Sequence, residues 1–167
     1  MKNFPFEHDG KIFWYSRSIA VATFVFCKNE EGEWCILMNK RGKSLEKSPG
    51  KWNCCSGFLD FDEDVIGCAI RETYEETGLV LNPRLLNYHN HNSKPDTDRQ
   101  TVTFFYYAIL PGTIDKYTDF LTNEHCEPDE VDEIDWIPLS MIITSDMDIA
   151  FNHDMHILDI YNKHIAN

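Results

Sequence analysis

In the stretch Gly57–Leu79, which reads GFLDFDEDVIGCAIRETYEETGL, four charged side chains fall within six residues: Arg71, Glu72, Glu75 and Glu76. If this segment is helical, spacings of three and four residues place the three carboxylates on one face. Like charges at such spacings destabilise a helix, so a compensating positive charge is expected. A divalent cation such as Mg²⁺ is the simplest candidate, because it prefers carboxylate oxygens and completes its coordination with water and phosphate. The alternative is a solvated acidic face on which Arg71 pairs with Glu75.

The expected helix has signals at both ends. Four acidic residues at its start can cap free amide groups and interact with the positive end of the helix dipole: Asp60, Asp62, Glu63 and Asp64. Gly78 falls where a left-handed residue would end the helix. The expected buried stripe consists of Val65, Ala69, Ile70 and Tyr74. The glutamates are therefore expected on the side of the helix that faces away from its core.

These residues resemble the Nudix box, G-x5-E-x7-R-E-U-x-E-E-x-G-U, in which U is an aliphatic residue. The matching positions are Gly57, Glu63, Arg71, Glu72, Glu75, Glu76, Gly78 and Leu79. The single departure is Thr73, which stands where an aliphatic residue is expected. Eight matches at fixed spacing make a specific motif. The resemblance implies an α/β fold, a Nudix-type α/β/α sandwich with a mixed central sheet.

The resemblance also implies an activity and a set of roles. The activity is metal-dependent hydrolysis of a nucleoside diphosphate linked to another moiety, with ADP-ribose, a nucleotide sugar or a nucleoside triphosphate as the small-molecule substrate. The implied ligands of Mg²⁺ or Mn²⁺ are Glu72, Glu75, Glu76 and the carbonyl of Gly57. Arg71 would orient the glutamates, and Glu63 would lock the loop or bind a further ion. The catalytic set is Glu75, Glu76 and Arg71. The general base stays open between a box glutamate and the distal acids Glu124, Glu127, Glu130 and Glu133.

Two other functions are compatible with the same fold. Isopentenyl diphosphate isomerase has a catalytic cysteine in a segment similar to residues 53–56, onto which Cys55 maps. That isomerase has a histidine soon after the cysteine, where this chain has Gly57, and metal-binding histidines near the first strand, where it has Ile19–Ala22. Two buried cysteines on a short strand are the simpler reading. A non-catalytic nucleotide-sugar sensor is the other candidate, although such modules usually have a broken box.

Composition narrows the class of protein. The 167 residues are 43% hydrophobic, which is typical of one globular domain over residues 1–167. The net charge of −13 argues against binding to nucleic acid or to an anionic membrane. No apolar run approaches the roughly 20 residues of a membrane span, and the start does not resemble a signal peptide. The six cysteines form no C-x-x-C pair, which favours reduced, mostly buried thiols in a cytoplasmic protein.

The order of apolar runs predicts the sheet. Ser18–Phe26 is apolar on both alternating faces and is predicted to be a central strand, with Trp34–Asn39 returning beside it as a hairpin. Three further strands are predicted at Leu85–His91, Thr101–Leu110 and Glu133–Ile137, with a helical turn opening at Pro138. Residues 1–17 are aromatic and could form an edge strand or cover a partner subunit, which would suit a homodimer.

Several side chains outside the box are candidate site residues. Lys40, Arg41 and Lys43 form the clearest basic cluster, either a solvated loop or a contact to substrate phosphate, and we assign Arg41 to substrate. Trp52 is predicted to be core rather than a base-stacking residue. Pro95 is a hint of ADP-ribose specificity, and His89 and His91 are expected on one strand face without a metal.

The last predicted element is a C-terminal helix, Asp154–Ile165, that covers the sheet. Its expected buried face consists of Met155, Leu158, Tyr161 and Ile165. His153 and His156 are expected on the surface.

Overall fold

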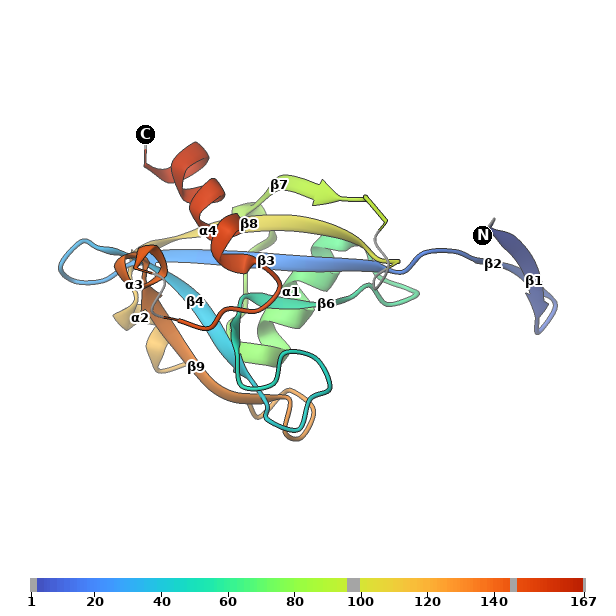
Figure 1. Cartoon of the computed structure of the whole chain (residues 1–167), viewed down its shortest axis with the longest axis horizontal. Coiled ribbons are helices and arrows are strands. Elements are labelled where there is room, and N and C mark those ends of the chain that lie inside the picture. Colours follow the sequence, from blue (N-terminus) through green and yellow to red (C-terminus); the bar gives the residue numbers. More distant parts are fainter. Residues whose placement is uncertain (1–2, 96–99, 145–146, 167) are drawn as a thin grey trace.

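The computed structural model describes residues 3–95, 100–144 and 147–166. A mixed sheet forms the centre of the molecule, with strand order β5-β4-β3-β8-β7, β6 paired to β3, and β9 paired to β4 (Figure 1). The β3–β8 pair is parallel and the other pairs of this sheet are antiparallel. The strands of the sheet are β3 Ile19–Lys28, β4 Trp34–Arg41, β5 Trp52–Asn53, β6 Cys55–Phe58, β7 Leu86–Asn92, β8 Val102–Thr113 and β9 Val131–Pro138.

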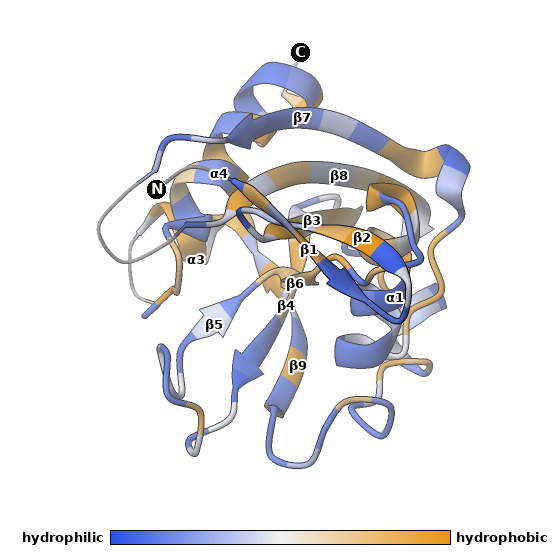
Figure 2. Cartoon of the chain, turned by 90° about the vertical axis from the view of Figure 1, so that its right-hand side faces the viewer, coloured by the Kyte–Doolittle hydropathy of each residue, from blue (hydrophilic) through white to orange (hydrophobic). Residues whose placement is uncertain are grey.

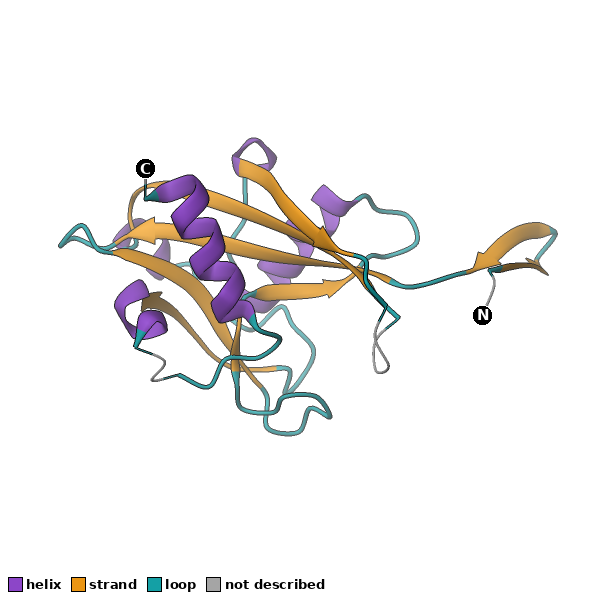
Figure 3. Cartoon of the chain, turned by 45° about the horizontal axis from the view of Figure 1, so that its top comes forward, coloured by secondary structure: helices purple, strands orange, loops and turns teal. Residues whose placement is uncertain are grey.

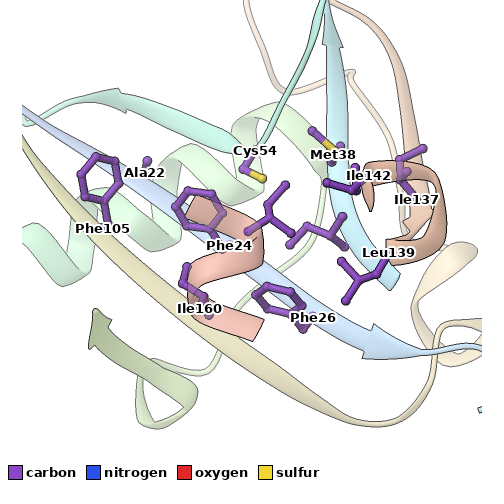
Figure 4. Packing of buried hydrophobic residues seen from close by; sticks show 12 residues of the cluster. Ala22, Phe24, Phe26, Met38, Cys54, Phe105, Ile137, Leu139, Ile142 and Ile160 are labelled. Atoms are coloured by element: carbon purple, nitrogen blue, oxygen red, sulfur yellow. The ribbon is translucent and has the colours of Figure 1, made fainter. Parts of the chain in front are cut away.

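Helices cover both faces of this sheet, and the central strand β3 has apolar residues that pack against a helix on each side. Its even-numbered residues, among them Phe24 and Phe26, pack against α4 His153–Ile160 (Figure 4). Its odd-numbered residues lie on the opposite side, where Val21 packs with Cys68 of α1 Val65–Thr77. A strand that is buried on both faces needs apolar residues at nearly every position, and the predicted central strand has them on both faces, with Thr23 as a buried polar exception. The predicted α/β/α arrangement with a mixed sheet is confirmed.

The other predicted elements lie close to their expected places. The β3–β4 hairpin, β7, β8 and β9 all overlap the predicted strands, and α3 Leu139–Ile143 begins directly after Pro138. Three short helical segments complete the order: η1 Pro83–Leu85, α2 Asp115–Thr118 and the π-helical turn η2 Tyr161–Ile165. Residues 96–99, between the strands predicted at Leu85–His91 and Thr101–Leu110, lie outside the described residues. Figure 2 shows the outer strand β7 as mostly hydrophilic, as expected for a sheet edge.

The strand β7 corrects one expectation. His89 and His91 were expected on one face, but a register shift between Tyr88 and Asn90 interrupts the alternation. The buried His89 contacts Asp159 at 2.9 Å, whereas His91 contacts the Tyr88 hydroxyl at 2.6 Å. The bulge therefore gives the two histidines separate surroundings.

The C-terminal helix covers the sheet as predicted (Figure 3), and three of the four predicted residues pack against the core: Leu158, Tyr161 and Ile165. The buried residues of α4 are His153, Ile157 and Ile160, while Met155 is 67% exposed. The chain enters α4 through Phe151 and Asn152, both with positive φ, and the helix starts at His153 rather than Asp154. The predictions for Met155 and for a surface His153 are therefore wrong, because His153 faces the sheet and its Nδ1 accepts a hydrogen bond from the Cys54 amide at 3.0 Å.

The N-terminal residues form a separate hairpin, β1 Phe4–His8 with β2 Lys11–Tyr15. This hairpin extends beyond one end of the main sheet (Figure 1). Ile12 and Trp14 are each 65% exposed, and the ring of Phe13 lies 5.3 Å from that of Phe61 on the body. The hairpin thus exposes apolar surface that a small two-stranded sheet does not bury by itself.

Candidate active site

The box segment folds into α1 with the predicted ends. The Asp64 side chain accepts hydrogen bonds from the amides of Ile66 at 3.0 Å and Gly67 at 2.8 Å. Gly78 ends the helix in the left-handed conformation, with φ of 77°, and its amide donates to the Tyr74 carbonyl. Both ends are held by local hydrogen bonds, so the box side chains project from a well-defined scaffold.

The predicted buried stripe of α1 is confirmed at Val65, Ala69 and Ile70, which pack against the core, but not at Tyr74. Tyr74 is 37% exposed and stacks on His125, with ring centroids 4.4 Å apart. Besides Ala69, the helix buries four residues outside the predicted stripe: Cys68, Thr73, Glu76 and Thr77. The expectation that Glu76 would face away from the core is wrong, because Glu76 is only 3% exposed and lies between the helix and the sheet.

Arg71 is the centre of an ion-pair network. Its guanidinium contacts Glu63 at 2.6 Å, Glu72 at 2.8 Å and Glu75 at 2.9 Å. The arginine holds the pKa of Glu63 down at about 2, and the Asp60 amide donates a further hydrogen bond to Glu63 at 2.9 Å. These contacts tie the loop before α1 to the middle of the helix. The sequence indicated the Arg71–Glu75 pair but did not indicate that Glu63 would be the main partner.

Glu76 has neutral partners instead. Its Oε2 accepts hydrogen bonds from Asn39 Nδ2 at 2.7 Å and from the Ser56 amide at 3.1 Å. Burial raises the pKa of Glu76 well above its usual value, and the negative charges of Glu72 and Glu130 add to this. Burial also raises the pKa of Glu72 to about 6. For both carboxylates the cost of burial outweighs their favourable contacts, which for Glu72 include the Arg71 guanidinium at 2.8 Å.

Gly57 allows Glu72 to approach the backbone of β6. A Cβ atom added at Gly57 would lie 2.0 Å from Glu72 Oε1, which is closer than any side chain permits. Glu72 therefore occupies the space that a side chain at position 57 would fill. Only glycine allows this contact between the carboxylate and the strand.

Within residues 3–95, 100–144 and 147–166, no three Asp, Glu, His or Cys side chains are arranged as a ready metal-ligand group. The residues nevertheless suit a hard divalent cation. Glu72, Glu75 and Glu76 offer only oxygen donors, and burial raises the pKa of Glu72 and Glu76 because their negative charge is incompletely compensated. A bound cation would supply that compensation, so the donor set fits Mg²⁺ or Mn²⁺.

Arg41 lies at the end of β4 and contacts a neighbouring loop. Its Nε donates to the Lys47 carbonyl at 3.0 Å, and its guanidinium lies 5.1 Å from the Phe151 ring centre. Neighbouring Lys40 pairs with Glu133 at 3.2 Å. Trp52 was predicted to be a core residue, and it lies half-buried against the main hydrophobic cluster.

Sequence reasoning missed one contributor to the site and left another undecided. Asn39 binds Glu76 directly, and its signal was an amide inside the apolar run of a predicted strand. Glu130 was one of four open candidates, and the structure distinguishes it because its charge acts on Glu72 and Glu76. The Glu130 carbonyl accepts a hydrogen bond from the Gly42 amide at 2.8 Å, which fixes this loop beside the end of β4.

Comparison with known proteins gives one family. Residues 18–156 match the NUDIX domain. An isopentenyl-diphosphate Delta-isomerase from Cutibacterium acnes is 28% identical over 104 residues, which cover 61% of this chain and 52% of the isomerase. An m7GpppN-mRNA hydrolase, NUDT17 from Danio rerio, is 32% identical over 68 residues, covering 41% of this chain and 22% of that protein. The matched region thus spans about half of one relative and about a fifth of the other.

Solved structures show the same fold. A MutT/nudix family protein from Enterococcus faecalis superposes with a TM-score of 0.71 at 21% identity, covering 92% of this chain and 64% of that chain. The NUDIX domain of Shewanella oneidensis NrtR complexed with ADP ribose gives a TM-score of 0.69 at 20% identity, covering 89% of this chain and 88% of the other. In the part of the chain that the structure describes, none of the helices is long and apolar enough to cross a membrane.

Proposed function

Because the chain belongs to the NUDIX family, we propose that it is a pyrophosphohydrolase that cleaves the phosphoanhydride bond of a nucleoside diphosphate linked to another group. The observation that carries this proposal is the complete set of charged box residues on one scaffold: Arg71 contacts Glu63, Glu72 and Glu75, and Glu76 lies buried between the same helix and the sheet. The proposed enzyme is a single NUDIX domain over residues 1–167. Its proposed cofactor is Mg²⁺ or Mn²⁺, and a similar solved structure supports this choice: a bifunctional NMN adenylyltransferase/ADP ribose pyrophosphatase from Francisella tularensis that is complexed with AMP and a Mn ion.

The proposed metal ligands are Glu72, Glu75, Glu76 and the carbonyl of Gly57. When bound, the cation supplies charge stabilisation for the phosphate oxygens and acidifies a coordinated water. Glu72 lies against the Gly57 strand because position 57 has no side chain, so the carboxylate and the backbone carbonyl come from adjacent parts of the site.

Four other residues have proposed roles around these ligands. Arg71 orients Glu72 and Glu75 through contacts of 2.8 and 2.9 Å, and Glu63 anchors Arg71 from the loop side. Arg41 contributes positive charge for a substrate phosphate at the end of β4. Glu130 is our choice of general base among the distal acids, because its charge acts on two proposed ligands whereas Glu133 pairs with Lys40.

The names of the relatives support a proposal for the substrate class. The NrtR domain is complexed with ADP ribose, and the curated relative from Danio rerio hydrolyses an mRNA cap. ADP-ribose or a nucleotide sugar is the proposed substrate, with nucleoside triphosphates as the next class to test. Neither nucleic acid nor membrane is a proposed partner, given the net charge of −13. The free, mostly buried cysteines support a cytoplasmic location.

The isomerase relative makes a second reaction worth testing. Both Cys54 and Cys55 are fully buried, and burial raises the pKa of each thiol well above its usual value. A catalytic cysteine requires an accessible, readily ionised thiol, so the surroundings of Cys55 favour a packing role. Isopentenyl diphosphate turnover that a thiol alkylator abolishes would support the isomerase instead.

The test is a substrate panel with the full chain. Nucleotide sugars, dinucleotides and nucleoside triphosphates are each incubated with Mg²⁺ or Mn²⁺, and the products are separated chromatographically. We expect release of a nucleoside monophosphate from one class, complete loss of release with a chelator, and recovery on adding the metal back. Binding of a nucleotide sugar without any metal-dependent product would refute the enzyme and favour a sensor.

A further inference from the structure

We propose that Asn39 is a positioning residue for the proposed metal ligand Glu76, holding one carboxylate oxygen so that the other stays available to the cation. This inference rests on the proposed function, since it concerns a ligand of the proposed cation. Asn39 is not part of the box and lies on β4, 37 residues before Glu76 in the chain.

The geometry supports a positioning role. Asn39 Nδ2 and the Ser56 amide both donate to the same atom, Glu76 Oε2, at 2.7 and 3.1 Å. The two donors come from different strands, β4 and β6, so they fix the carboxylate from two directions. Glu76 Oε1 takes no part in either of these hydrogen bonds. The carboxylate is thereby fixed in orientation at a single oxygen.

The chemistry explains why an amide suits this place. Asn39 is 1% exposed and follows the buried apolar residues Leu37 and Met38, where a charged side chain would be costly. A neutral donor orients a carboxylate without cancelling its charge. Arg71 does the opposite for Glu63, whose negative charge it compensates directly. The charge of Glu76 therefore remains for a cation.

The rival explanation is that Asn39 only satisfies buried polar groups of the core. The chain offers a matched control for this, because Asn53 lies directly opposite Asn39 in the β4–β5 pairing. Asn53 is 0% exposed and its amide donates to the Cys54 carbonyl at 2.9 Å. The two asparagines are thus equally buried neighbours, and Asn39 is the one that donates to Glu76.

The experiment measures Mn²⁺ binding to the full chain without nucleotide, by the electron paramagnetic resonance signal of free Mn²⁺. The proteins compared are the wild type, Asn39→Leu and Asn53→Leu, each checked for folding by circular dichroism and thermal melting. Asn39→Ser serves as a second variant, since it also removes the amide but leaves more room in the core. Loss of a residue that orients a ligand typically weakens metal binding by roughly 10–100-fold, so we expect this rise in Kd for both Asn39 variants.

The control variant separates positioning from packing. We expect Asn53→Leu to change the Mn²⁺ Kd by less than about twofold, even if it lowers the melting temperature as much as Asn39→Leu does. Equal Mn²⁺ affinities of wild type and Asn39→Ser, or equal losses at both asparagines, would overturn the inference while leaving the proposed function intact. A folded wild-type protein that binds no Mn²⁺ and releases no product would overturn both.

Discussion

Glu63 and Glu76 belong to the same box, but the protein surrounds them in opposite ways. Glu63 meets the Arg71 guanidinium at 2.6 Å, and its pKa falls to about 2. Glu76 meets only the neutral donors Asn39 and Ser56 in these hydrogen bonds, and burial raises its pKa far above normal. The first carboxylate stabilises the folded loop. The second costs stability in the absence of a cation, and such a cost is expected at a site kept for binding or catalysis.

The largest effect is expected at the uncompensated carboxylate. Glu76→Gln removes the negative charge but keeps an oxygen that can accept from Asn39 and Ser56. We expect turnover with Mg²⁺ to fall by at least about 100-fold, because a proposed ligand to the cation is lost. Unfolding in urea with chelator present should show equal or higher stability than the wild type, because a buried charge is removed. Near-normal turnover would contradict the ligand role.

Removing the Arg71 side chain, whose positive charge compensates Glu63, should have the next largest effect. Arg71→Ala leaves Glu63, Glu72 and Glu75 without their shared partner, and we expect a loss of about 3 kcal/mol in the free energy of unfolding. Lys40→Ala, which breaks the more exposed pair with Glu133, is the control and should cost less than about 1 kcal/mol. Similar losses for the two variants in urea titrations would mean that the network is not a structural centre.

The two kinds of carboxylate should also have opposite pH dependence in the metal-free protein. Glu63 has a folded pKa below its ordinary 4.5, so its stabilisation is full above 4.5 and is lost as the pH falls toward 2. Glu72 has a folded pKa of about 6, so stability is lost as the pH rises from 4.5 to 6. Stability curves of Glu63→Gln and Glu72→Gln should each lack one of these slopes. Unchanged slopes in both variants would refute the assignment.

The smallest effect is expected at the one departure from the box pattern. Thr73 is fully buried, and its hydroxyl donates to the Ala69 carbonyl one helical turn earlier at 2.7 Å. This hydrogen bond stays within the helix and does not reach the proposed metal ligands. Thr73→Val should therefore change stability by less than about 1 kcal/mol and turnover by less than about twofold. A strong loss of turnover would show that the hydroxyl has a role in the site.

Features of the fold that depend on neighbouring residues could be predicted from the sequence, whereas contacts between distant segments could not. The ends of α1 could be predicted because Asp64 and Gly78 act on backbone groups within a few residues. The doubly buried β3 could be predicted because its apolar residues occupy both faces. The burial of Glu76 could not be predicted, because its hydrogen-bond partners lie on strands that are distant in the sequence. A helical periodicity pattern counts every glutamate as a polar, exposed position.

The C-terminal helix shows the same limit. Periodicity alone favoured a stripe through Met155, but the turn at Phe151 and Asn152 sets where the helix starts and directs His153 to the sheet. Positive φ at two non-glycine residues leaves little trace in the sequence, although asparagine tolerates it better than most residues. Contacts between distant segments decided both of these positions, and a single sequence does not encode them in any local pattern.

The central claim is that the inner carboxylates of α1 bind a divalent cation. The most direct measurement is an anomalous difference map from crystals of the full chain soaked in Mn²⁺. Our account predicts a strong peak between Glu72, Glu75 and Glu76, near the Gly57 carbonyl, and no such peak in Glu76→Gln crystals. Metal-dependent turnover in solution together with a peak elsewhere, and none at these glutamates, would contradict it.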